Sequence, residues 1–212
     1  APRDGLRRAL AYALSNCDRS VGATLAGKLA LGEIKAPASG FALSFTGYAG
    51  QAFGFACTDG MHLSLSGFAN DALGEAMSGG IIAVFPPDVV RADPPAELSV
   101  VGNAVAYGAT GGKLFVCGRA GQRIGVRNSG ATIVVEGAGK YAFEYMTGGT
   151  GVVLGELGAV IASGMTGGVV YVLKADHETH PLAERVHPDA CLVPLADGDQ
   201  ERLFALLSEH VV

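Results

Sequence analysis

A repeat of about twenty residues constrains the fold of this 212-residue chain more than any other feature. A glycine precedes each of seven short apolar runs, at Gly40, Gly60, Gly80, Gly112, Gly130, Gly149 and Gly168. Consecutive glycines are 20, 20, 32, 18, 19 and 19 residues apart. The one long spacing contains residues 86–97, which are rich in proline and aspartate. We interpret this segment as an insertion that forms a surface loop.

Two columns of apolar residues keep the same position in every repeat. The residues three after each glycine are Leu43, Leu63, Ala83, Phe115, Ile133, Val152 and Tyr171, and those five after it are Phe45, Leu65, Phe85, Cys117, Val135, Leu154 and Leu173. Side chains two apart in a strand share a face, so both columns are predicted to point inward. Because one coil cannot bury its own apolar face, the repeat predicts a parallel β-helix of about seven stacked coils. A β-propeller does not fit this repeat, because each blade would need about 40 residues.

The composition agrees with an all-β fold. The chain has 32 glycines, 9 prolines, 49% hydrophobic residues and only 17% charged residues. Glycine is unfavourable in helices, and we assign the excess to tight turns between coils. A net charge of −5 without a basic block argues against nucleic-acid binding. Residues 151–173 carry a single charge but six glycines, so we expect buried β-structure there and no membrane span.

Helical spacing at both ends of the chain predicts caps for the solenoid. Residues 1–20 are expected to form a capping helix and a lead-in, because leucines in Asp4–Asn16 recur at helical intervals. The β-helix is expected to occupy residues 21–173, and residues 174–212 a loop and a second helix at Gln200–His210. The four cysteines are widely spaced and form no C-x-x-C pair, which favours free thiols in the cytoplasm.

A third column, four residues after each glycine, is expected to point outward. It is polar in the first two repeats and apolar afterwards, and its later members are Val84, Val116, Val134, Val153 and Val172. Either the chain's own terminal segments or neighbouring turns cover these valines, or the valines form a docking surface for another domain or subunit. We therefore treat the five valines as a possible partner interface.

Three arginines, Arg119, Arg123 and Arg127, recur every four residues and join this possible interface. They could converge on an acidic partner. The alternative that we favour is ion pairing with Glu136 and Glu144 on adjacent coils. A further hypothesis places an active site of the chain itself in the cleft between Arg119 and Arg127.

Other motifs carry weaker signals. Residues 137–140 and 108–113 have glycines followed by lysine but lack the rest of a phosphate-binding loop, so we interpret both as coil turns. The histidines His177, His180 and His187 have a spacing that could begin a metal site, although a solvated loop is favoured. We predict no catalytic, cofactor-binding or metal-binding residue in this chain.

Eight short motifs in a fixed order are specific enough to indicate a family. They are NCDRSVG at 16–22, GYAGQAFG at 47–54, AND at 69–71 with SGG at 78–80, YGAT at 107–110, VRNSGA at 126–131, VVEG at 134–137, EYMTGG at 144–149 and GMTGG at 164–168. With them the chain resembles the C-terminal domain of the glutamate synthase large subunit. The resemblance implies a right-handed β-helix that acts as a non-catalytic scaffold between a glutamine amidotransferase domain and an FMN-binding synthase barrel. FMN and an iron–sulfur cluster are then expected on those partners, with reductive amination of 2-oxoglutarate as the reaction.

Two related assemblies offer alternatives. A free-standing version of this domain resembles a subunit of N-methylglutamate synthase and, more distantly, the C subunit of formylmethanofuran dehydrogenase, which belongs to a formyl-transferring complex. Each of these alternatives keeps the chain as a scaffold and changes only the chemistry of its partners.

Overall fold

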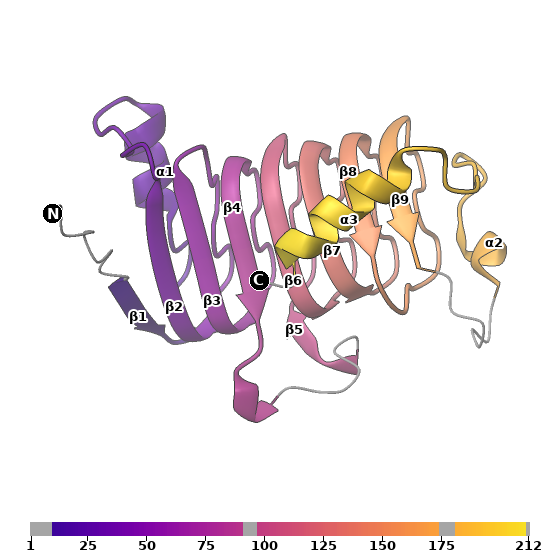
Figure 1. The fold of residues 1–212 in the computed structure, drawn as a ribbon. Helices are drawn as coiled ribbons and strands as arrows, with labels where there is room; N and C mark the ends of the chain where they lie inside the picture. Colours follow the sequence, from indigo (N-terminus) through magenta and orange to yellow (C-terminus); the bar gives the residue numbers. More distant parts are fainter. Residues whose placement is uncertain (1–9, 91–96, 174–180, 211–212) are drawn as a thin grey trace, which may run out of the picture.

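The computed structural model describes residues 10–90, 97–173 and 181–210, and its main feature is one sheet of parallel strands (Figure 1). The strands lie in the order β1-β2-β3-β4-β6-β7-β8-β9, and β5 pairs with β3 and β6 beside this path. Their bounds are β1 Leu10–Leu14, β2 Phe41–Ala49, β3 Met61–Ala69, β4 Ser78–Phe85, β5 Ser99–Val101, β6 Gly111–Ala120, β7 Ser129–Ala138, β8 Thr147–Val153 and β9 Gly167–Val172. Sequential parallel strands require the chain to return behind the sheet after each strand. The sheet is therefore one wall of a solenoid.

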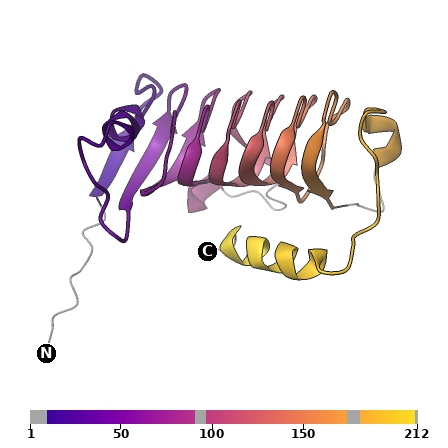
Figure 2. The ribbon, with the colours of Figure 1, turned by 90° about the horizontal axis from the view of Figure 1, so that it is seen from above.

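The solenoid has about six turns, and the predicted β-helix is confirmed. Each turn consists of one strand and one return stretch that lies on the opposite side of the molecule (Figure 2). The seventh glycine of the repeat, Gly168, lies in β9, and the chain then leads to the short helix α2 (Leu182–Arg185) instead of another strand. This is why the structure has one turn fewer than the repeat predicts.

Two ladders of side chains point from the sheet into the core. Paired residues form the columns Leu43, Leu63, Ile82, Leu114, Ile133, Gly151, Val170 and Phe45, Leu65, Val84, Val116, Val135, Val153, Val172. The predicted ladders are right for the repeats that begin at Gly40, Gly60 and Gly130. They are wrong by one residue for the other four, because the inward residues there lie two and four residues after the glycine instead of three and five.

The returns have a backbone conformation that the sequence did not predict. In each of the six returns, three alternate residues have positive φ: 52, 54, 56; 72, 74, 76; 104, 106, 108; 123, 125, 127; 141, 143, 145; and 160, 162, 164. Their N–H groups donate alternately to the next and the preceding coil, as in Arg123 N to Lys140 O (2.9 Å) and Gly125 N to Val105 O (2.8 Å). Five glycines, Gly54, Gly74, Gly108, Gly125 and Gly164, thus belong to these hydrogen-bonded returns.

The ends of the solenoid differ from the prediction. The predicted helix at Asp4–Asn16 is wrong, because Leu10–Leu14 forms strand β1 paired with β2, and residues 4–9 lie outside the described residues. Instead a helix that was not predicted, α1 (Ala23–Ala30), packs against the core through Ala26, Leu25 and Leu29. The helix at Gln200–His210 is confirmed as α3 (Asp199–His210), but it lies along the outer face of the sheet (Figures 1 and 2).

The insertion and the apolar segment also have defined places. After β4 the chain leaves the sheet through the short helix η1 (Asp88–Val90) and re-enters as β5 (Figure 1). Residues 151–173 contain the end of β8 and all of β9, as predicted. Within the described part of the chain, no helix is long and apolar enough to cross a membrane.

Candidate functional site

The outer face of the sheet is the first candidate surface, and α3 covers half of it. Outward residues of β6 to β9, namely Phe115, Val134, Val152 and Tyr171, are buried there and pack against Leu203, Leu206 and Leu207 of the helix. The same column is polar in β2 and β3, where the Ser64 hydroxyl donates to Ser44 Oγ at 3.1 Å. A 12-residue helix is about 18 Å long, which suits four strands spaced about 4.8 Å apart. The chain's own C-terminal segment therefore covers the apolar half of this face.

The five valines of the predicted interface do not form an exposed column. Val84, Val116 and Val153 are 0% exposed in the core, and Val172 packs partly buried against it. Their predicted outward orientation is wrong, because the register shift places them on the inward ladder. Val134 does point outward, but it is fully buried beneath α3.

Polar contacts fix both ends of α3. At its start the Tyr171 hydroxyl donates to Asp199 Oδ1 at 2.6 Å, which lowers the pKa of Asp199 and raises that of Tyr171. Arg202 Nη2 donates to Thr150 Oγ1 at 2.7 Å, and near the end Lys113 Nζ lies 2.6 Å from Glu209 Oε2. These contacts at both ends fix the direction of α3 relative to the strands.

His210, the last residue of α3, is a buried charged residue. Its Nε2 lies 2.7 Å from Glu136 Oε1, its side chain is 2% exposed, and its carbonyl oxygen lies 3.8 Å from Cys117 Sγ. Burial acts to lower the pKa of the imidazole, but interactions with Cys117 and Glu136 outweigh it and raise the pKa to about 9. At neutral pH His210 is therefore protonated and forms an ion pair with Glu136.

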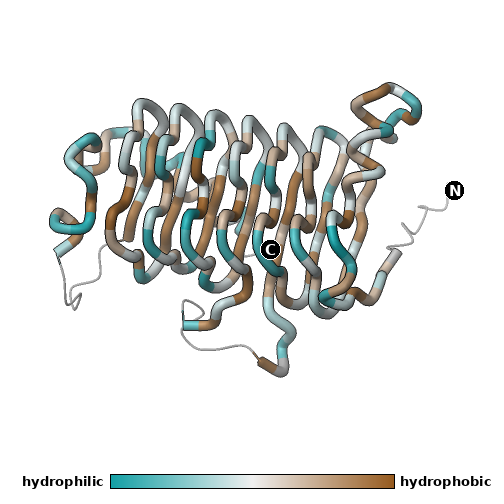
Figure 3. The backbone as a smooth tube through the Cα atoms, turned by 180° about the vertical axis from the view of Figure 1, so that it is seen from behind, coloured by the Kyte–Doolittle hydropathy of each residue, from teal (hydrophilic) through white to brown (hydrophobic). Residues whose placement is uncertain are grey.

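The returns form a second candidate surface, on the side opposite α3 (Figures 2 and 3). Arg123 Nε lies 3.5 Å from Glu144 Oε2, and its guanidinium lies 4.8 Å from the centre of the Tyr141 ring. Arg127, four residues on, is exposed. The predicted pairing with Glu144 is confirmed for Arg123, whereas Glu136 pairs with His210. Arg119 lies in β6 and pairs with Glu156 at 2.7 Å.

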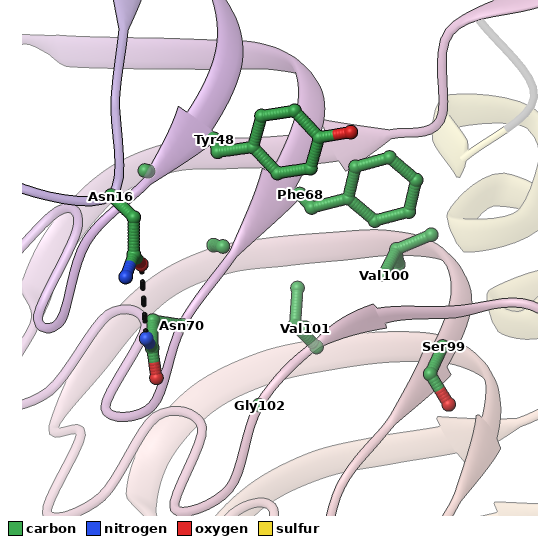
Figure 4. Close-up of a pocket in the computed structure, with 10 residues that line it drawn as sticks. Asn16, Tyr48, Phe68, Asn70, Ser99, Val100, Val101 and Gly102 are labelled. Carbon is green, nitrogen blue, oxygen red and sulfur yellow. Dashed lines mark hydrogen bonds between the residues drawn. The ribbon is translucent and has the colours of Figure 1, made fainter.

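A recess of about 370 Å³ lies on the outer face where the insertion interrupts the repeat (Figure 4). Tyr48 and Phe68 from β2 and β3 stack there with ring centres 5.4 Å apart, next to Val100 of β5. At the other end Asn70 Nδ2 donates to Asn16 Oδ1 at 3.0 Å. Aromatic rings and amides suit binding of an apolar or planar group and not acid–base chemistry. The repeat pattern gave no signal for this recess, and only the insertion marks its place.

The remaining motifs are the histidines that could begin a metal site and the glycines that precede lysine. His187 pairs with Asp189 at 3.0 Å, while His177 and His180 lie outside the described residues. No group of three or more His, Cys, Asp or Glu residues in the described ranges could hold a metal ion. Residues 137–140 continue from β7 into a coil turn, and a Cβ on Gly139 would lie 2.9 Å from the Gly121 backbone. The close approach at Gly139 agrees with the interpretation of residues 137–140 as a coil turn.

Comparison with known proteins decides the family. The family model described as "GXGXG motif" matches residues 3–211. The chain belongs to the GXGXG motif family. Alternate residues of each return have positive φ, and at most one of the three in each return is glycine.

Relatives of this GXGXG chain are glutamate synthases. It is 46% identical over 202 residues to a ferredoxin-dependent glutamate synthase of Cyanidium caldarium, covering 94% of this chain and 13% of the relative. It is 44% identical over 207 residues to ferredoxin-dependent glutamate synthase 2 of Synechocystis, with the same shares. The NADH glutamate synthase of Schizosaccharomyces pombe is 42% identical over 173 residues, 80% of this chain and 8% of the relative. The chain thus spans about an eighth or less of the length of these relatives.

Proposed function

We propose that this chain is a non-catalytic β-helix domain or subunit of a glutamate-synthase-type oxidoreductase. It holds together a glutamine amidotransferase and an FMN-binding synthase domain or subunit, which carry the FMN and the iron–sulfur cluster. The observation that carries the proposal is the match of 94% of this chain to one segment of much longer glutamate synthases. A cytoplasmic location belongs to the same proposal.

The architecture supports a scaffold role. Each return is hydrogen-bonded to both neighbouring coils, so a load on one coil is shared along the solenoid. The strands and returns give two long faces, and α3 covers only the half of the sheet from β6 to β9. Surfaces on the returns and around the Tyr48–Phe68 recess are therefore available for other polypeptides.

The test compares the chain alone with the complete assembly. We expect the purified chain to form no glutamate from glutamine, 2-oxoglutarate and a reductant, and the assembly with both partners to do so. The measurement is glutamate production with and without added partner polypeptides. Turnover by the chain alone would overturn the scaffold role and support an active site in the chain itself.

A variant with a disrupted solenoid provides the control. Gly151→Leu places a side chain against Phe143 in the core and is expected to remove both assembly and turnover. Thr24→Ala, at an exposed position of α1, is expected to retain both. Partners that transfer formyl groups, found by mass spectrometry of the native complex, would point to the alternative assembly.

A further inference from the structure

Large side chains occupy two columns of the return surface where neighbouring coils have small ones. The first positive-φ position is Ala52, Ala72 and Ala104 in the first three returns, then Arg123 and Tyr141, and then Val160 in the sixth. The third position is Ala56, Ala76 and Gly108 in the first three returns, then Arg127 and Tyr145, and then Gly164. At the third position, only the fourth and fifth returns have large side chains.

The fold does not require these large residues. Arg127 N donates to Glu144 O at 2.9 Å, and Gly108 N makes the equivalent bond to Val126 O at the same length. Arg127 and Tyr145 have φ of 56° and 53°, a conformation that is unfavourable for bulky residues. Every return has positive φ here, so the fold requires the conformation but not a bulky residue in it. Residues held in unfavourable conformations are characteristic of functional surfaces.

We define the Arg–Tyr patch as Arg123, Arg127, Lys140, Tyr141 and Tyr145. Tyr145 is 55% exposed, and its ring lies over Gly164, where a Cβ would come within 2.6 Å of Cδ1. Arg127 and Lys140 are exposed. Tyrosine and arginine are the residues most enriched at the centres of protein interfaces, and rings that are already positioned lose little entropy on binding.

The charge of the patch identifies the partner's chemistry. It carries three cations against a single neighbouring carboxylate, Glu144, whose side chain is only 17% exposed and pairs with Arg123. This local excess of positive charge occurs in a chain whose net charge is −5. Arg127 makes no ion pair with any described residue, so its charge is free for a partner.

We infer that the Arg–Tyr patch docks a carboxylate-bearing surface of a partner polypeptide in the assembly, with Arg127 and Lys140 pairing with carboxylates and the Tyr145 ring covered. This inference rests on the proposed scaffold function. A domain of the same assembly is favoured over a second copy of this chain, because the relatives carry the segment as about 13% of a longer chain.

The test uses substitutions that the repeat itself tolerates. The double variant Arg123→Ala with Arg127→Gly adopts the residues of the preceding return, Ala104 and Gly108, and keeps the fold. In the complete assembly with the amidotransferase and synthase polypeptides, we expect at least tenfold weaker association by sedimentation. We also expect a smaller dependence of association on salt, because exposed ion pairs are screened. The matched control, Lys28→Ala with Lys35→Ala, removes two exposed charges away from the patch and should leave association unchanged.

A zero-length carbodiimide cross-link adds a positional measurement. In the complete assembly Lys140 should become linked to an aspartate or glutamate of the amidotransferase or synthase polypeptide. Unchanged association of the double variant, with the wild type assembled, would overturn the inference and leave the proposed function standing. A wild type that associates with neither polypeptide would overturn the proposed function as well. A Lys140 cross-link to a second copy would overturn the assignment of the partner.

Discussion

At the scale of single residues, Phe143 shows how the core combines coils that are not identical. It occupies the middle position of its return, where the other five returns have Gly or Ala. Its ring is accommodated because Gly125 and Gly151 have no side chain, and a Cβ on either would lie 2.6 Å from the ring. Gly151 in turn stands on an inward ladder whose other members are large. The large side chain of Phe143 therefore fills the space left by the missing side chain at Gly151, and the core keeps its packing density.

Combining Phe143→Gly with Gly151→Leu should cost less stability than the two single substitutions together. Gly151→Leu should destabilise the fold by about 3 kcal/mol or more through overpacking, and Phe143→Gly by about 3–5 kcal/mol through a cavity. The double variant recreates the pattern of the other coils, so its loss should be clearly smaller than the sum. Denaturant unfolding of the three variants measures this coupling. Strictly additive losses would contradict the packing described here.

A matched pair of lysine substitutions tests the register of the outer column. Val153 lies in the core, so Val153→Lys should unfold the chain, since an unpaired buried charge costs several kcal/mol. Val134 lies under α3, so Val134→Lys should release the helix and keep the solenoid. Circular dichroism and limited proteolysis of α3 distinguish the two results. The same outcome for both variants would show that one of these valines is misplaced.

At the scale of elements, α3 attaches to the sheet through an apolar stripe and a buried ion pair. Leucines at helical spacing cover the outward column, while His210 and Glu136 meet at the helix end. Groups facing His210 are Cys117 and Phe115 from β6, Glu136 from β7, and the nearby pair of Lys113 with Glu209. One contribution to the attachment of α3 therefore depends on the protonation of His210.

The attachment of α3 should weaken with rising pH. The pKa of His210 is raised from 6.5 to about 9 in the folded chain, so protonation stabilises the docked helix. This contribution is complete below about pH 6.5 and is lost as the pH rises through about 9. Thermal unfolding midpoints should therefore fall more from pH 6.5 to 9.5 in the wild type than in His210→Gln. Equal pH dependence of the two proteins would argue against the protonated ion pair.

At the scale of the whole molecule, the period and the apolar pattern predicted a solenoid, because only stacking buries the inward ladders of coils this short. The exact register could not be predicted, since the distance from the glycine to the first inward residue is three residues in three repeats and two in the other four. The pairing of Arg123 with Glu144 was predicted from their places on adjacent coils. The Tyr48–Phe68 recess was not, because it depends on where β5 re-enters the sheet.

The sequence by itself determined the parallel β-helix, the insertion, the C-terminal helix and the family, because each is encoded by local spacing or by short ordered motifs. Tertiary structure alone decided which valines face the core, that α3 covers the outer face, and that residues 10–14 form a strand. These features depend on contacts between segments far apart in the chain, such as His210 with Glu136, which no local pattern specifies. Tertiary structure also decided the conformation of the returns, whose amides bond to the coils on both sides.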